Sequence, residues 1–336
     1  MQASKTYLLR IINAGINDEL FFGIASHKLT VVEIDASYTK PLQTDTILLA
    51  PGQTASVLLT ANQPATSRYI MAARAYSSSS NPFDNTTTTG FLDYTFAGNS
   101  STAPSSTPMS NMPPLPAFND TAFAINFNKN LRALGSSEFP SKVSQSVDRE
   151  LFYTVGLARK ECPTGKNCTG PSGGKFAAAV NNISFSLPTT ALLQAFFLNN
   201  ANGDSSTVFP TDFPDNPIPV FNYTGPQPTN LKPQIGTHLS HLPFNASVQL
   251  ILQDTSILGT ESHPIHLHGF NFFVVGQGVG NYNASSDTAN FNLVDPLERN
   301  TDSVPKGGWA ALRFRSDNPG KSIVQFQNSS IQRCTL

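Results

Sequence analysis

Short stretches of alternating apolar and polar residues recur along the first hundred residues of the chain. In residues 29–35, for example, Leu29 and Val31 alternate with Thr30 and Val32. Turn-forming residues such as Pro51 and Gly52 separate these stretches. Regularly spaced short strands with turn signals between them are typical of an antiparallel β-sandwich. The predicted strands are residues 6–12, 20–25, 29–35, 46–49, 55–60, 69–73 and 90–96.

The pattern changes at residue 97. Residues 97–116 are rich in Ser, Thr, Pro and Asn and lack the apolar residues that build a core, so they are predicted to form a linker. Strand-like segments return at residues 150–156, 182–185, 248–253, 271–276 and 309–315. Two short helices are expected, at residues 130–134 and 189–197. With 336 residues, 25 Pro and 22 Gly, the chain is predicted to form two β-rich domains or one large all-β domain.

Charge and hydropathy exclude two classes of function. Charged residues make up only 13% of the chain and the formal net charge is -1, without a basic patch, so no nucleic-acid partner is expected. No segment approaches the length of apolar residues that a membrane span needs. The N-terminal residues lead directly into the strand at 6–12 and are too polar for a secretory signal, so this chain is expected to carry no signal peptide.

Cysteines and glycosylation sequons nevertheless favour a secreted protein. Cys162 and Cys168 flank a loop of five residues, which predicts a disulfide formed in an oxidising compartment; a reduced pair and a metal-binding pair are the alternatives. Cys334 is left over. N-x-Ser/Thr sequons are dense, although this density is also what an Asn-, Ser- and Thr-rich composition gives by chance. The candidate glycosylation sites are Asn85, Asn99, Asn119, Asn167, Asn182, Asn222, Asn245, Asn283 and Asn328.

Three of the six histidines fall within residues 263–268, directly before an apolar stretch. If this segment is a strand, its side chains alternate between two faces. His266 and His268 then share one face, and His263 points to the other. Imidazole binds copper, zinc, iron and nickel, so one strand is predicted to supply ligands to two metal centres. A zinc site built from all three histidines is the alternative, but residues that alternate along a strand do not converge easily on one ion.

Several longer strings resemble the plant laccases of the multicopper oxidase family. The resemblance covers residues 5–320 and rests on segments in both halves of the chain. The supporting segments are residues 6–14, 17–22, 45–53, 176–185, 252–255, 263–269 and 292–296. The resemblance implies cupredoxin-like Greek-key β-sandwich domains: an incomplete second domain at residues 1–98, a linker at 99–148, and a third domain at 149–336 without its C-terminal copper-binding segment.

The resemblance also implies chemistry. Laccases oxidise phenols one electron at a time at a type 1 copper and reduce dioxygen to water at a cluster of type 2 and type 3 coppers. By resemblance to the family motif H-P-x-H-L-H-G, His263 corresponds to a type 1 ligand, His266 to a type 2 ligand and His268 to a type 3 ligand. Asn17, Asp18 and Glu19 correspond to the loop that contacts the phenol, where a carboxylate could accept the phenolic proton. The implied protein is secreted to the apoplast, acts on lignin-type phenols or flavonoids, and uses dioxygen.

The sequence also departs from the family. The H-W-H and H-x-H motifs that supply other cluster ligands have no counterpart in the 336 residues, and neither does H-C-H-x-x-x-H, whose Cys is the type 1 thiolate. A blue-copper site needs two His and one Cys, and four coppers need more histidines than the six present. We therefore expect this chain to be inactive alone. Two hypotheses remain open: an incomplete version of a secreted laccase, or a non-catalytic truncated product that acts as a binding or decoy module or has no function. The phenol and the oligomeric state stay undetermined.

Overall fold

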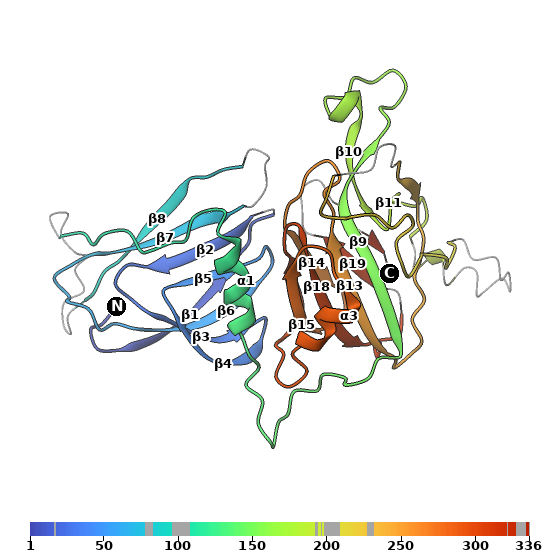
Figure 1. Ribbon diagram of the computed structural model, residues 1–336. Helices are drawn as coiled ribbons and strands as arrows, with labels where there is room; N and C mark the ends of the chain where they lie inside the picture. Colours follow the sequence, from blue (N-terminus) through green and yellow to red (C-terminus); the bar gives the residue numbers. More distant parts are fainter. Residues whose placement is uncertain are drawn as a thin grey trace. The chain divides into compact units, whose positions relative to one another are not determined.

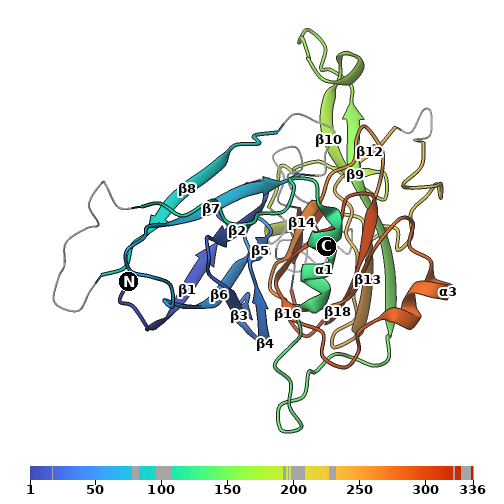
Figure 2. The ribbon, with the colours of Figure 1, turned by 60° about the vertical axis from the view of Figure 1, so that its left-hand side comes forward.

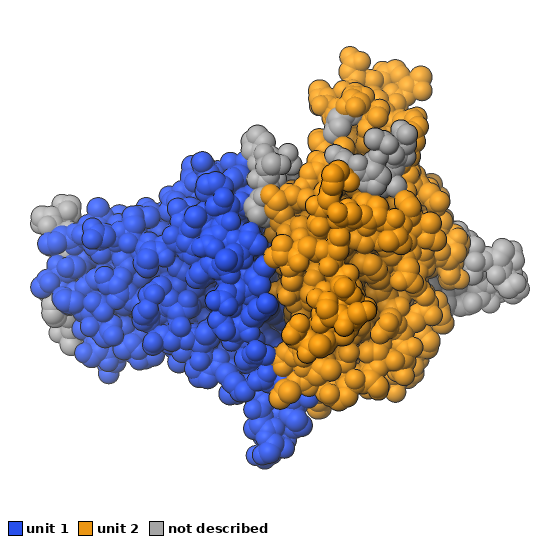
Figure 3. Space-filling view, in the orientation of Figure 1, with its two compact units in different colours: residues 1–141, 295–299 blue, residues 142–294, 300–336 orange. Residues whose placement is uncertain are grey.

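The computed structural model has two compact units (Figure 3). Unit 1 comprises Met1–Ser141 and Asp295–Arg299, and unit 2 comprises Lys142–Val294 and Asn300–Leu336. The structure describes residues 1–16, 18–77, 83–95, 108–191, 194–195, 197, 209–226, 232–320, 322–326 and 334–335.

Unit 1 consists of two four-stranded antiparallel sheets and one helix (Figure 1). The strand order is β1-β6-β3-β4 in one sheet and β5-β2-β7-β8 in the other. The strands are β1 Thr6–Ile12, β2 Glu19–Ile24, β3 Leu29–Ile34, β4 Ser37–Thr44, β5 Thr46–Leu49, β6 Thr54–Thr60, β7 Tyr69–Tyr76 and β8 Thr87–Leu92. Alternate residues of these strands form one core that includes the fully buried Phe21, Leu29 and Val57.

Helix α1, Thr121–Asn130, completes the core of unit 1. Asp120 caps its N-terminus by accepting a hydrogen bond from the Phe123 backbone N–H at 2.9 Å, and Leu131 ends it with extended backbone. Phe123 and Phe127, one turn apart, have ring centroids 6.3 Å apart, and Phe123 meets Phe21 edge-on at 5.5 Å. The helix is therefore stabilised by burial of its aromatic face.

Unit 2 contains a large mixed sheet and a smaller sheet (Figure 2). The strands of unit 2 in the large sheet have the order β12-β11-β10-β9-β13-β18-β15, and the smaller sheet has the order β17-β14-β19-β20. The strands are β9 Arg149–Lys160, β10 Lys175–Val180, β11 Ile183–Phe185, β12 Gln234–Gly236, β13 Ser247–Asp254, β14 His263–Leu267, β15 Phe272–Val279, β17 Thr301–Val304, β18 Gly308–Arg315, β19 Ile323–Phe326 and β20 Cys334–Thr335. The short strand β16, Glu298–Arg299, and the helical turns η1 Pro171–Gly173, α3 Ala284–Asp287 and η2 Thr288–Asn290 complete the assigned elements.

Both faces of the large sheet of unit 2 are covered. Leu250 and Leu252 of β13 pack with Ile265 and Leu267 of β14 in the core between the two sheets. Ile251, between them in sequence, belongs to a second cluster around Trp309 on the opposite face. All eight residues of β13 are consequently buried.

Trp309, the one tryptophan of the chain, packs against glycines in the neighbouring strand β15. A Cβ atom at Gly278 would lie 2.8 Å from the indole ring, and one at Gly276 would lie 2.8 Å from Phe291. The absent side chains of β15 thus make the space that the large rings of Trp309, Phe291 and Tyr282 fill.

The prediction of an all-β fold is confirmed, whereas the predicted helix at residues 130–134 is wrong, since α1 ends at Asn130. At 189–197, Gln194, Ala195 and Phe197 are helical, residues 189–191 are not, and residues 192, 193 and 196 lie outside the described residues. The predicted linker includes helix α1, and its described part up to residue 141 belongs to unit 1. The domain boundaries at 98 and 148 stay a prediction. In the described part of the chain, no helix is both long and apolar enough to span a membrane.

Candidate metal centre

Strand β14 carries the histidine run and lies between β17 and β19 in the smaller sheet of unit 2. Its side chains alternate, so that Ile265 and Leu267 point into the core between the sheets. His263 has the same parity and is 1% exposed. His266 has the opposite parity and is half-buried, and His268 is exposed.

The imidazole of His263 is held by a carboxylate from the opposite sheet. Its Nε2 atom lies 3.1 Å from Oδ1 of Asp254, the last residue of β13. The other oxygen of Asp254 accepts a hydrogen bond from the Gly307 backbone N–H at 2.6 Å. Burial raises the pKa of Asp254, and the hydrogen bond with His263 opposes that rise.

The second ring nitrogen of His263, Nδ1, is buried without a hydrogen-bond partner in the structure. Buried polar atoms are nearly always paired, so such an atom requires an explanation. When Asp254 is ionised it can only accept, so Nε2 carries the proton and Nδ1 presents its lone pair. A neutral imidazole oriented by a carboxylate in this way is a typical metal ligand.

His266 has its tautomer fixed by the backbone. Its Nδ1 lies 2.7 Å from the carbonyl oxygen of Asn300. Because a carbonyl oxygen can only accept, Nδ1 must donate, and the lone pair is then on Nε2. The rings of His266 and His268 meet edge-on with centroids 4.8 Å apart. The rings of His266 and His268 thus lie together on one side of β14, and His263 lies on the other side.

Gly269 ends the run with a left-handed backbone, φ +79°. A Cβ atom here would lie 2.7 Å from Nδ2 of Asn318, which donates a hydrogen bond to the Gly269 carbonyl at 3.0 Å. Glycine is therefore required both for the turn and for the close approach of Asn318.

The three histidines do not form a single closed site. Within the described ranges, no group of three or more His, Cys, Asp or Glu side chains is gathered so that it could hold a metal ion. The donor atoms that are present, Nδ1 of His263 and Nε2 of His266, fit copper as separate ligands on opposite sides of β14. Imidazole is a suitable copper ligand, but each position supplies fewer ligands than a copper site needs.

The residues expected to contact a phenol are in unit 1. Asn17 lies outside the described residues. Asp18 is half-buried, and burial together with the nearby Asp84 raises the pKa of its carboxyl group. Glu19 begins β2 and is 5% exposed. The two carboxylates therefore have unlike environments, and Asp18 is the more accessible.

Cys162 and Cys168 form a disulfide bond, as the loop between them predicts. Most described sequon asparagines are exposed, which is compatible with glycosylation; these are Asn85, Asn119, Asn167, Asn222, Asn245 and Asn283. Asn182 is half-buried, and its Nδ2 donates to the Lys232 carbonyl at 3.0 Å. Asn99 and Asn328 lie outside the described residues.

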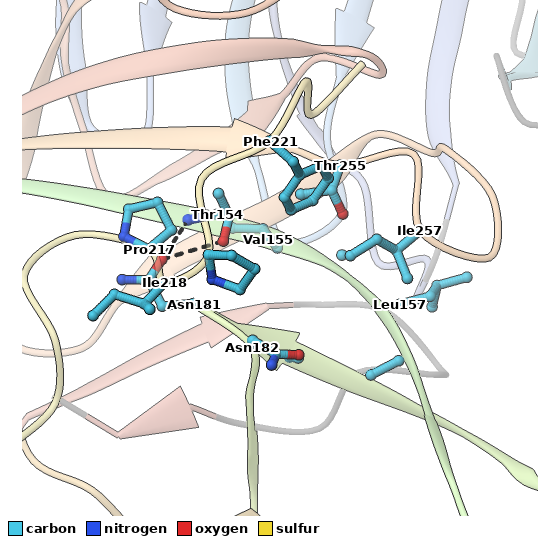
Figure 4. Close-up of a pocket in the computed structure, with 14 residues that line it drawn as sticks. Thr154, Val155, Leu157, Asn181, Asn182, Pro217, Ile218, Phe221, Thr255 and Ile257 are labelled. Atoms are coloured by element: carbon cyan, nitrogen blue, oxygen red, sulfur yellow. Dashed lines mark hydrogen bonds between the residues drawn. The ribbon is translucent and has the colours of Figure 1, made fainter. Parts of the chain in front are cut away.

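The described residues of unit 2 line a smaller and a larger hollow. The smaller, about 20 Å³, is shown in Figure 4, where Thr154 donates to the side-chain oxygen of Asn181 from both its backbone N–H, at 2.8 Å, and its hydroxyl, at 3.2 Å. A cavity of this size holds one water molecule. The larger, about 670 Å³, is mainly apolar and is lined by Leu267 and Phe270, which flank His268 and Gly269 in the sequence.

Comparisons with known proteins identify the family of the chain. Two protein-family models, both described as "Multicopper oxidase", match the sequence at residues 1–97 and 212–327. The chain is 52% identical over 328 residues to Laccase-17 of Arabidopsis thaliana and 51% identical over 322 residues to Laccase-12 of Oryza sativa subsp. japonica. Each match covers 95% of this chain, and 56% and 55% of the relative. The chain thus spans little more than half the length of these relatives.

Solved structures show the same fold. The laccase of Botrytis aclada superposes with a TM-score of 0.63 at 23% identity, over 97% of this chain and 50% of that one. Fet3p, described as a multicopper oxidase that functions in iron import, superposes with a TM-score of 0.65 at 19% sequence identity. The match covers 97% of this chain and 54% of the Fet3p chain. The folds are those of copper oxidoreductases built from cupredoxin domains. The chain belongs to the multicopper oxidase family, as a homologue of the plant laccases.

Two residues of the site have no role in the sequence-based prediction. Asp254 falls within residues 252–255, which support the family resemblance, but that string does not reveal its contact with His263. Asn300 acts through its backbone carbonyl, which any residue would supply. Asp254 reaches His263 because the two sheets of unit 2 pack face to face. The Asn300 carbonyl reaches His266 because β14 pairs with β17.

Proposed function

We propose that β14 provides one arm of the copper assembly of a laccase, and that the complete protein oxidises phenols and reduces dioxygen to water. The observation that carries this proposal is the unpartnered buried Nδ1 of His263, on the opposite side of the strand from the adjoining rings of His266 and His268. Bound copper would supply one-electron redox chemistry. Four one-electron oxidations of phenol balance the reduction of one dioxygen to two waters.

The residues of this chain would bind and orient. His263 would use Nδ1 at a type 1 position, with Asp254 holding the proton of Nε2. His266 would use Nε2 at a type 2 position because the Asn300 carbonyl occupies its Nδ1 proton. His268 would serve a type 3 position beside it. Second-shell hydrogen bonds of this kind fix ring orientation and raise ligand basicity.

We propose the loop of Asn17, Asp18 and Glu19 as the phenol contact. An electron that leaves a phenol makes its hydroxyl acidic, so a nearby carboxylate can take the proton. Asp18 is suited to this role because the raised pKa of its carboxyl makes it a stronger base than an ordinary Asp. The lignin-type or flavonoid nature of the phenol, and secretion to the apoplast, are part of this proposal and rest on the plant relatives, the disulfide and the sequons.

We propose further that the 336-residue chain alone does not oxidise phenols. Of its other histidines, His27 has both ring nitrogens in hydrogen bonds and His238 pairs with Asp212 at 2.7 Å. The remaining ligands would have to come from other parts of a complete protein. The alternative is a non-catalytic truncated product with a binding or decoy role. Both hypotheses predict that the 336-residue chain is inactive, but only the first requires that a longer protein is made.

Copper titration of the purified chain tests the ligand assignment. We expect weak binding of Cu(II), detected by calorimetry and electron paramagnetic resonance, that His266→Ala with His268→Ala removes. The matched control is His241→Ala, which changes an exposed histidine of the same unit. A purified chain that holds four coppers and oxidises a phenol would refute the inactivity. Copper binding that survives the double substitution unchanged would refute the ligand roles.

A further inference from the structure

The hairpin formed by β9 and β10 carries a cluster of positively charged side chains. Arg159, Lys160, Lys166 and Lys175 lie on it, and Lys232 adjoins it through an ion pair with Glu161 at 3.2 Å. We name these five cations the basic hairpin. Glu161 is the only carboxylate within residues 155–185, whereas the whole chain has a formal net charge of -1. Positive charge is therefore concentrated here, so the expectation from the sequence that the chain has no basic patch is wrong.

The strand register places like charges against each other. Lys175 is the direct antiparallel partner of Lys160. Like charges directly opposite each other in a β-ladder destabilise it. The Lys160 ammonium donates a hydrogen bond to the backbone carbonyl of Phe185 at 3.3 Å, and this neutral acceptor leaves the positive charge uncompensated. An external anion between the two ammonium groups would remove this repulsion.

The tip of the hairpin is accessible and constrained. Figures 1 and 2 both show it projecting beyond the rest of unit 2. The disulfide of Cys162 and Cys168 closes the loop, and Lys166 within that loop is exposed. A constrained surface loses less conformational entropy on binding than a mobile loop does.

Aromatic surface accompanies the charge. Phe176, which follows Lys175 on β10, is 50% exposed, and its antiparallel partner is Arg159. The ribbon thus presents ammonium groups on one face and an exposed phenyl ring beside a guanidinium on the other. A sugar polymer offers carboxylates to the first and C–H faces to the second, whereas a flat lipid surface meets only one face at a time.

We propose that the basic hairpin binds an anionic polysaccharide whose charges are carboxylates, such as a polyuronate. The inference does not depend on copper or on the oxidase activity. Single exposed ion pairs contribute little and are weakened by salt, so binding would come from several contacts along one polymer. Such binding would attach the protein to a polymer matrix.

Binding of polygalacturonate to the full chain tests the proposal, with affinity electrophoresis as the assay at low and at physiological ionic strength. We expect retention at low salt that decreases as salt rises, and no retention by neutral dextran. Lys160→Gln with Lys175→Gln should weaken binding about five- to tenfold, since two of the screened contacts are lost. The matched control is Lys5→Gln with Lys142→Gln, which removes two exposed cations elsewhere and should change binding less than about twofold.

Thermal unfolding separates binding from folding. The variant with Lys160 and Lys175 replaced should unfold at the same temperature as the parent or a higher one, because a like-charge pair is removed. Equal loss of retention in both double variants would overturn the proposal, because it would show a non-specific charge effect. Binding to vesicles of anionic phospholipid without binding to polygalacturonate would also overturn it.

Discussion

The carboxylate of Asp254 lies 3.1 Å from Nε2 of His263, and both side chains are almost completely buried. The two groups come from different sheets of unit 2, so their contact depends on the packing of β13 against β14. The same contact therefore contributes to the stability of unit 2 and orients the imidazole of His263, a candidate metal ligand.

Asp254→Ala should lower the free energy of unfolding by about 3 kcal/mol, because it leaves a buried donor on His263 and a partly buried donor on Gly307 without an acceptor. Urea unfolding followed by circular dichroism measures this change. Asp45→Ala is the control: it breaks an exposed ion pair with Lys28 and should cost less than about 1 kcal/mol. Equal losses in the two variants would contradict a special role for Asp254.

Gly278→Ala should destabilise unit 2 by about 1–3 kcal/mol, because the added methyl group meets the indole of Trp309 in a filled space. The control is Gly90→Ala in β8, where the new Cβ atom would have only an ordinary contact, 3.4 Å from Met71. Urea unfolding of both variants compares the two sites. An unchanged unfolding midpoint for Gly278→Ala would mean that the indole moves aside without cost.

Acid should destabilise unit 1 through His27. Burial lowers the pKa of this imidazole, whose Nδ1 donates to the Ala25 carbonyl at 2.7 Å and whose Nε2 accepts from the Tyr94 hydroxyl at 2.5 Å. The unfolded chain therefore binds a proton more readily than the folded chain, so this stability is complete above about pH 6.5 and is lost as the pH falls below it. The thermal midpoint of unit 1 should therefore be lower at pH 5 than at pH 7, because the folded chain resists protonation of this group.

His27→Gln supplies the comparison, since it keeps a buried polar side chain that does not titrate. Its thermal midpoint should depend less on pH in this range than that of the parent chain. If both proteins show the same dependence, another group is responsible.

Removing the disulfide by Cys162→Ser with Cys168→Ser should act locally. Closing so short a loop restricts the unfolded chain by about 2 kcal/mol. Most of that effect should fall on the hairpin, because its tip does not contribute to the main core of unit 2. Limited proteolysis should therefore cut the double variant within residues 161–174 faster, while its urea midpoint changes little. Faster proteolysis throughout unit 2 would show that the hairpin supports the whole unit.

Alternating residues predicted strand β1 with the bounds that the structure has, Thr6–Ile12. Strand β4 escaped prediction because it is polar and contains Pro41; as the edge strand of its sheet it tolerates a residue without an N–H. Strand β10 escaped because Ala177, Ala178 and Ala179 favour strand weakly. Helix α1 depends on tertiary contacts of Phe123 and Phe127, since its Asn residues are poor helix formers.

The candidate site was predictable only in part. Strand periodicity alone separates His263 from His266 and His268, and the structure has this separation. The groups that orient the rings were not predictable from local pattern, because Asp254 comes from the facing sheet and Asn300 contributes only its carbonyl.

The packing of Trp309 gives the molecule a built-in optical probe. All tryptophan emission of this chain arises from one buried ring in unit 2, whereas the aromatic residues of unit 1 are tyrosine and phenylalanine. Selective excitation of tryptophan therefore reports the melting of unit 2 alone, and circular dichroism reports both units together. A difference between the two melting curves would reveal whether the units unfold independently, without any label being added.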